Sequence, residues 1–294
     1  GTQDQTSEVH RAVDAALKLV NQQMSTYIAD SELSLFNASA RTDAVTVSSD
    51  LFNVLRLSRD IGEKTQGAFD VTVGPLVNLW GFGPQGRIEK APNEEVIEDA
   101  INKIGLNQYA LDNDKSTIQK MRADLYIDLS AVAKGFGVDQ VASVLESFGI
   151  KGYLVEIGGE LRAQGTKPEG ESWLIAIESP DSTSRSVQKI IQVNDIAIAT
   201  SGDYRNYFEE EGVRFSHTID PSTGKPITHN LASVSVLMPT CAEADALATA
   251  FMVLGTEAAY SYALEHGIEA AFIYKSGSGF KELVTPGFSK YLVK

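Results

Sequence analysis

Apolar residues recur every three or four positions over residues 9–24, a spacing that predicts an amphipathic helix behind the candidate cap residues Thr6 and Ser7. The same reasoning predicts further helices at residues 50–64, 93–103, 131–148, 242–254 and 257–266. Shorter apolar runs predict strands at residues 109–111, 125–129, 152–157, 172–177, 190–193, 213–219 and 231–238. Because helices and strands do not alternate regularly, the pattern fits an α+β or α/β fold and argues against a barrel or a doubly wound sheet.

The composition fits one large domain or two closely joined lobes. The 294 residues are 43% hydrophobic and 22% charged, which is enough to bury a substantial core. No internal repeat or long polar linker marks a boundary, so we expect a single domain over residues 1–294. No apolar run reaches the roughly 18 residues that a membrane helix needs, so no membrane span is expected.

The net charge of −14 opposes nonspecific binding to nucleic acids or anionic lipids, because such binding needs clustered Lys and Arg. We therefore expect no nucleic-acid partner, and a phosphate-bearing ligand would need a metal ion or backbone amides to neutralise it. The single cysteine, Cys241, excludes an intrachain disulfide and any multi-cysteine zinc or iron–sulfur site.

The segment 217–226 crowds an imidazole, a carboxylate, hydroxyls and an ammonium into one turn-rich loop between two predicted strands. Loops held in this way often carry function. The simpler interpretation is a polar hairpin in which Pro221 and Gly224 form the turn. The loop alone does not decide between the two.

Asp245 and Thr249 lie four residues apart in a predicted helix, so a carboxylate and a hydroxyl share one helix face. These are oxygen ligands of the kind that Mg²⁺ prefers, and the four histidines lack the paired spacing of a zinc helix. The alternative is structural: Asp245 complements the start of its own helix, and Thr249 bonds back to its own backbone.

The run 128–137 lies where a predicted strand ends and a helix begins, a place where free amides and the helix dipole attract anions. Lys134, one turn into that helix, could reach a phosphate. The alternative is that Asp128 or Ser130 is an ordinary N-cap. Two further glycine-containing runs, 156–160 and 67–75, offer close backbone approach or tight turns.

Taken in chain order, six motifs together resemble the ApbE family of FAD:protein FMN transferases. They are residues 67–75, 128–137, 156–160, 201–204, 217–226 and 245–249. The resemblance implies a single α+β domain with mixed or antiparallel sheets flanked by helices. It also implies that FAD is the substrate and that Mg²⁺ assists transfer of its FMN half to a Thr or Ser hydroxyl of an acceptor protein, with release of AMP.

The resemblance also assigns residues. It implies that Mg²⁺ is bound by Asp245, Thr249 and the backbone carbonyl of Ala131. It implies that FAD is contacted by Ser25, Thr26, Tyr27, Ala68, Phe69, Asp70, Asp128, Lys134, Gly158, Gly159, His217 and Ile219. Cleavage of a pyrophosphate by a hydroxyl needs charge neutralisation and a proton acceptor. We expect Lys134 to help neutralise the phosphate charge. We expect His217, oriented by Asp220, to act as the base.

Two departures from the family pattern concern the start of the chain. Family members usually carry a Thr-Met-Gly-Thr-like strand before the first helix, and this strand is not in the sequence. They are commonly exported and anchored through an N-terminal cysteine, whereas Cys241 lies in mid-chain. The resemblance therefore predicts a periplasmic location, with membrane association only through an anchor outside this sequence.

The expected acceptors are redox-pump subunits that carry a threonine within a motif of the type Asp-x-x-Ser/Thr-Gly-Ala-Ser/Thr. Two other functions remain open. Water could replace the acceptor hydroxyl, which would make the protein an FAD pyrophosphatase. The protein could also bind or store FAD without turnover.

Overall fold

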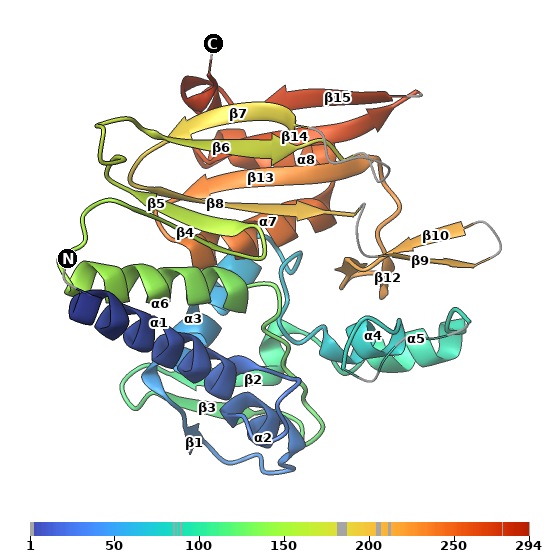
Figure 1. The fold of residues 1–294 in the computed structure, drawn as a ribbon. Coiled ribbons are helices and arrows are strands. Elements are labelled where there is room, and N and C mark those ends of the chain that lie inside the picture. Colours follow the sequence, from blue (N-terminus) through green and yellow to red (C-terminus); the bar gives the residue numbers. More distant parts are fainter. Residues whose placement is uncertain are drawn as a thin grey trace. The chain divides into compact units, whose positions relative to one another are not determined.

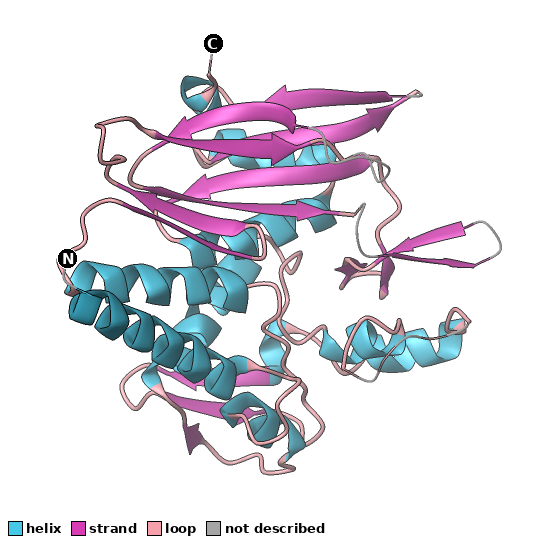
Figure 2. Cartoon of the chain, in the orientation of Figure 1, coloured by secondary structure: helices cyan, strands magenta, loops and turns pink. Residues whose placement is uncertain are grey.

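The computed structural model describes residues 3–84, 86, 88, 90–180, 187–203, 207–210, 213–277 and 279–293. The chain falls into two compact units. Unit 1 contains Gly1–Val20, Val132–Arg205 and Asn230–Lys294, and unit 2 contains Asn21–Ala131 and Asn206–His229. Helices and antiparallel sheets occur together, so the predicted α+β class is confirmed (Figure 2). The single domain over residues 1–294 stays a prediction.

Unit 1 is built on a six-stranded antiparallel sheet (Figure 1). In spatial order its strands are β15 (Gly279–Val284), β14 (Glu269–Ser276), β13 (Leu231–Met238), β8 (Ile196–Gly202), β5 (Glu160–Gln164) and β4 (Tyr153–Ile157). All residues of β13 except the last are buried, as expected for a strand covered on both faces. Alternate residues of β8 face opposite sides: Ile198 packs with β6 (Trp173–Glu178) and β7 (Val187–Val193), and Ala197 packs with helical residues.

The helices that the structure describes in unit 1 are four α-helices and a short 3-10 helix. They are α1 (Gln3–Met24, of which residues 21–24 belong to unit 2), α6 (Ala133–Ser147), α7 (Cys241–Leu254), α8 (Thr256–Glu265) and η2 (Phe288–Tyr291). Helix α7 packs on β8 and β13, and α6 packs on α7 and β4 (Figure 1). The predicted first helix is confirmed, but Thr6 and Ser7 are not its caps, because the helix begins at Gln3.

Unit 2 consists of shorter elements. Its helices are α2 (Glu32–Ala38), α3 (Ser49–Lys64), α4 (Gly74–Leu79), α5 (Glu94–Ile101) and η1 (Leu106–Gln108). Its strands are β1 (Val45–Thr46), β2 (Tyr109–Asp112), β3 (Thr117–Lys120), β9 (Tyr207–Glu210), β10 (Val213–Ser216), β11 (Ile219–Asp220) and β12 (Lys225–Pro226). The first three strands form one sheet, and the others form two hairpins. Ser48 caps α3 by accepting a hydrogen bond from the amide of Leu51.

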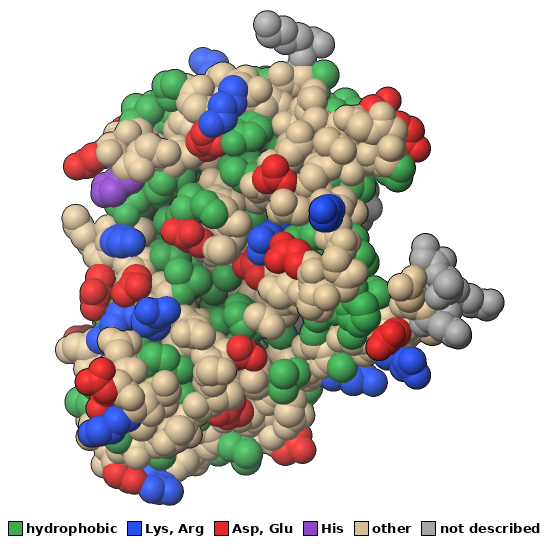
Figure 3. Space-filling view, turned by 90° about the vertical axis from the view of Figure 1, so that its left-hand side faces the viewer, with side chains coloured by type: hydrophobic (Ala, Val, Ile, Leu, Met, Phe, Trp, Pro, Cys, Tyr) green, Lys and Arg blue, Asp and Glu red, His purple; other side chains and the backbone are tan. Residues whose placement is uncertain are grey.

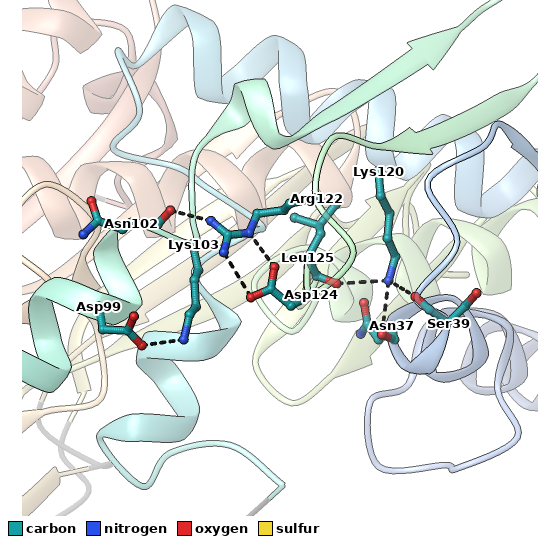
Figure 4. Close-up of polar contacts among 9 residues, drawn as sticks. All are labelled: Asn37, Ser39, Asp99, Asn102, Lys103, Lys120, Arg122, Asp124 and Leu125. Carbon is teal, nitrogen blue, oxygen red and sulfur yellow. Dashed lines mark hydrogen bonds and ion pairs between the residues drawn. The ribbon is translucent and has the colours of Figure 1, made fainter.

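A buried lysine fastens the core of unit 2. Lys120 is 2% exposed, and its Nζ donates to the carbonyls of Asn37, Ser39 and Leu125 at 3.2, 2.6 and 3.2 Å (Figure 4). The ammonium also lies 4.8 Å from the centre of the Phe36 ring. Burial lowers the pKa of Lys120 from its ordinary value. The three carbonyls compensate the charge, so the lysine ties the end of α2 to the segment after β3.

The predicted strand at residues 125–129 is wrong, although its alternate residues are buried. Within the described part of the chain, the segment pairs with no strand. The side chain of Asn37 binds both the amide and the carbonyl of Ile127, at 2.9 and 2.8 Å. The amide of Asp128 donates to the carbonyl of Val71 at 2.8 Å. A side chain and a loop therefore supply the hydrogen bonds that a neighbouring strand would have supplied.

The surface charges and the helix lengths are relevant to binding of nucleic acids and membranes. On the face drawn in Figure 3, acidic and basic side chains are interspersed rather than gathered into one basic field. Within the described ranges, no helix has the length and apolar character needed to cross a membrane.

Candidate functional site

In unit 1, the candidate phosphate-binding lysine is held by a buried carboxylate. Lys134 lies in the first turn of α6, and its Nζ is 2.6 Å from Oε1 of Glu160 at the start of β5. The side chain of Glu160 is 5% exposed, whereas that of Lys134 is 48% exposed. Oε2 of Glu160 is buried and has no hydrogen-bond partner in the described part of the chain. The buried carboxylate of Glu160 thus holds the Lys134 ammonium in place, and the lysine side chain remains accessible to a ligand.

Sequence reasoning missed Glu160, although the motif 156–160 contains it. The glycines of that motif form the turn they predict. Gly158 and Gly159 are the two residues between β4 and β5, with φ of 68° and 108°. Two successive positive φ angles are typical of a tight hairpin and favour glycine. A Cβ on Gly158 would lie 3.3 Å from Oε2 of Glu160 and 3.4 Å from Cδ of Lys134, so the turn lies directly beside the ion pair.

The carboxylate of Asp245 lies at the beginning of α6. Asp245 is 4% exposed, and its Oδ2 accepts a hydrogen bond from the amide of Gly135 at 3.0 Å. Burial, and after it the negative charge of Glu160, raises the pKa of Asp245 well above its ordinary value of 3.8, while Lys134 and the Gly135 amide oppose that rise. The structure therefore gathers two buried carboxylates around one ammonium.

Both structural alternatives for this region need correction. Asp245 does not merely complement the start of its own helix, because its carboxylate binds the amide of another helix, α6. Neither Asp128 nor Ser130 caps α6: its N-cap is Val132, which makes no side-chain cap bond, and Oδ1 of Asp128 accepts from the amide of Ser130. The hydroxyl of Thr249 lies 3.5 Å from that of Ser201 on β8.

In unit 2, Asp70 is a buried carboxylate bound to its own loop. Its Oδ1 accepts from the amide and the hydroxyl of Thr72 at 2.8 and 2.6 Å. Burial raises the pKa of Asp70, and the two Thr72 bonds counteract that rise. Phe69 is 2% exposed, so its side chain belongs to the core. Of the three predicted contact residues in this loop, only Ala68 is partly exposed.

The segment around Ser25, Thr26 and Tyr27 follows α1 directly. The carbonyl of Ser25 accepts hydrogen bonds from two serine hydroxyls near the start of α2, so the turn is fixed. Tyr27 is 71% exposed and available to a partner or ligand.

The loop 217–226 has the backbone of a hairpin, as the simpler interpretation predicted. Strands β11 and β12 pair through Ile219 and Pro226, and the amide of Gly224 donates to the carbonyl of Asp220 at 2.8 Å. Nε1 of Trp80 donates to the carbonyl of Gly224 at 2.8 Å, which holds the turn against α4.

The candidate base and its predicted partner lie in this hairpin. His217 is partly buried, edge-on to Phe82 with 6.3 Å between ring centres. Oδ1 of Asp220 accepts from the amide and the hydroxyl of Ser222 at 2.8 and 2.7 Å. That carboxylate therefore stabilises the turn, and its orientation of His217 stays a prediction.

The predicted site residues are divided between the units. Unit 1 contains Lys134, Gly158, Gly159, Asp245 and Thr249. Unit 2 contains Ser25, Thr26, Tyr27, Ala68, Phe69, Asp70, Asp128, Ala131, His217, Ile219 and Asp220. Ile219 is buried in an apolar cluster with α4 and α5. Tyr204, the last residue of the fourth motif, lies outside the described residues.

Comparison with known proteins decides what these motifs belong to. The model of the ApbE family matches residues 2–272. The chain belongs to the ApbE family. A relative from Vibrio cholerae, named FAD:protein FMN transferase, is 47% identical over 282 residues, which are 96% of this chain and 84% of the relative. A Haemophilus influenzae protein of the same name is 46% identical over 290 residues, and the match covers 97% of this chain and 84% of the relative.

Solved structures of ApbE proteins share the fold of this chain. The flavin transferase ApbE from Vibrio cholerae superposes with a TM-score of 0.90 at 45% identity, covering 97% of this chain and 91% of that one. The ApbE protein of Thermotoga maritima superposes with a TM-score of 0.88 at 28% identity, covering 100% and 94%. The predicted family and enzyme class are thereby confirmed.

Proposed function

We propose that the protein transfers the FMN half of FAD to a Thr or Ser hydroxyl of an acceptor protein in a Mg²⁺-dependent reaction that releases AMP. Membership of the ApbE family and the name of its relatives support flavin transfer. The observation that carries the finer proposal is the cluster at the start of α6, where Glu160 and Asp245, both buried, flank Lys134. Such a cluster can hold a cation and a phosphate together.

The oxygen atoms of unit 1 fit a hard divalent ion. Asp245 offers a buried carboxylate that is only partly compensated by one amide, and Thr249 adds a hydroxyl one turn later. Among the described residues, no three His, Cys, Asp or Glu gather into a metal cluster. Mg²⁺ does not need one, because it commonly uses one or two carboxylates and completes its shell with water and substrate phosphates. We propose Asp245 and Thr249 as ligands, with the carbonyl of Ala131 as the third.

The chain's own residues then have distinct tasks. Lys134 binds a phosphate oxygen, with its ammonium held in place by Glu160. The amides at the start of α6 favour the same anion. Mg²⁺, when bound, would neutralise charge on the pyrophosphate. The acceptor hydroxyl oxygen forms a bond to the phosphorus of the FMN half, the bond from that phosphorus to the AMP oxygen breaks, and His217 takes the hydroxyl proton.

The test uses the whole protein with FAD, Mg²⁺ and an acceptor domain that carries the threonine motif. We expect flavin fluorescence on the acceptor after denaturing electrophoresis, together with an equal amount of AMP. Asp245→Ala should lose the Mg²⁺-dependent labelling, whereas Glu257→Ala, an exposed change at the start of α8, should keep it. Full labelling by Asp245→Ala would refute the metal role, and free FMN without labelled acceptor would identify a hydrolase.

For partners and location, we propose redox-pump subunits as acceptors and the periplasm as the compartment. Both proposals depend on the family resemblance. Mass spectrometry of flavin-labelled proteins from cells with and without an active copy of this enzyme tests the first. Fractionation of cells that produce the protein tests the second.

A further inference from the structure

Helices α6 and α7 touch backbone to backbone at one point. A Cβ on Gly135 would lie 2.3 Å from the carbonyl oxygen of Cys241 and 2.9 Å from Cα of Ala242. Both are far closer than van der Waals contact allows, so only glycine fits at this position of α6. The contact lies in the first turn of each helix.

From this contact, each helix caps the other. Four residues beyond Cys241, Asp245 accepts a hydrogen bond from the amide of Gly135 at 3.0 Å. Four residues beyond Gly135, Asp139 accepts from the amides of Cys241 and Ala242 at 3.0 and 2.9 Å, one with each carboxylate oxygen. The amides at a helix start have no partner within their own helix, so each carboxylate satisfies donors that would otherwise be buried without one. The arrangement is reciprocal.

Asp139 is itself held by residues of the sheet. Nη1 of Arg162, on β5, lies 3.1 Å from Oδ1 of Asp139, and Nη2 lies 3.4 Å from Oε1 of Glu146. The same oxygen of Glu146 accepts from the hydroxyl of Tyr153 on β4 at 2.5 Å. The Asp139 side chain is 13% exposed. The carboxylate that caps α7 is therefore bound to β5, the strand that begins with Glu160.

We propose that Asp139 is a positioning residue for the metal and phosphate site. It touches neither ligand. By binding the first two amides of α7, it fixes the start of that helix, and therefore the carboxylate of Asp245 one turn later, relative to Lys134 and Glu160. Residues that orient metal ligands commonly change metal affinity 10- to 100-fold when they are replaced. The inference rests on the proposed function, because it concerns the same site.

Mn²⁺ binding, followed by electron paramagnetic resonance without FAD, measures this role independently of turnover. We expect Asp139→Ala to weaken Mn²⁺ binding at least about tenfold. Asp139→Asn retains one acceptor oxygen and should fall between Asp139→Ala and the unchanged protein. The matched control is Glu146→Gln, which alters the same arginine network on the same helix but leaves both α7 amides bound, so it should change the affinity less than about twofold.

Thermal unfolding of each variant separates positioning from stability. If Asp139→Ala lowers the melting temperature but binds Mn²⁺ as tightly as the unchanged protein, Asp139 is only structural and the proposal is wrong. The same conclusion follows from Asp139→Asn if the alanine variant does not fold. If the unchanged protein binds no Mn²⁺, or Asp245→Ala binds it equally well, the proposed metal site itself is refuted and this inference with it.

Discussion

Gly135→Ala is the sharpest test of the α6–α7 contact. The added methyl would meet the carbonyl oxygen of Cys241 at 2.3 Å, where ordinary contact begins near 3.4 Å, and the obstacle is backbone rather than the end of a flexible side chain. Helices α6 and α7 must therefore separate by about 1 Å. Overpacking of this kind costs roughly 1 to 3 kcal/mol, and the upper end applies because two backbones have to move. Alanine recovers about 1 kcal/mol through its better helix propensity.

We therefore expect Gly135→Ala to lower the free energy of unfolding by about 2 kcal/mol, measured by urea denaturation with circular dichroism. Gly137→Ala is the matched control two residues along α6. Its methyl would meet Cδ1 of Ile157 at 3.4 Å, an ordinary contact, so it should stabilise the protein by up to about 1 kcal/mol. Equal effects of the two substitutions, or no loss for Gly135→Ala, would contradict the reasoning.

Two further predictions concern unit 2. Lys120→Met removes the donor to three carbonyls and should lower the free energy of unfolding, measured by urea denaturation, by about 3 kcal/mol. The control Lys103→Met breaks the exposed pair with Asp99 in Figure 4 and should lower it by less than about 0.5 kcal/mol. Similar losses in the two variants would refute the role of Lys120. Burial raises the pKa of Tyr109 from 10.0 to about 12, so its stabilising contribution is complete below pH 10 and is lost as the pH rises through 12. Unfolding curves should show this loss, and Tyr109→Phe should reduce it; an unchanged pH dependence in that variant would exclude Tyr109 as its source.

The sequence predicted best where a local pattern coincides with burial on a whole face. Strand β13 was predicted with its observed bounds, because a continuous apolar run of that length suits a strand covered on both sides. Helix α3 was predicted to within one residue. The segment 125–129 was predicted wrongly as a strand. Its alternating apolar residues indicate which side chains are buried, but they do not indicate that a side chain, Asn37, rather than a neighbouring strand binds the backbone. Helices α2 and α4 were missed because each is only two turns or less.

For the site, too, some residues could be predicted from the sequence, but their contacts could not. Lys134 and Asp245 could be selected from residue type and helix position. Their surroundings could not, because Glu160 is 26 residues from Lys134 and the Asp245 carboxylate binds an amide 110 residues away. Asp139 likewise caps amides that lie 102 and 103 residues further along the chain. Pairings over such separations are decided by tertiary packing, on which local periodicity carries no information.

The order of the strands in unit 1 also determines when that unit can form. β13 joins β8 to β14 in the middle of the sheet, yet it begins at Leu231, late in the chain. A chain that is still being synthesised, and of which Leu231 has not yet been added, holds β4, β5 and β8 with an uncovered edge at β8 and without the helix that carries Asp245. Any fragment ending there is therefore a liability for aggregation rather than a smaller enzyme.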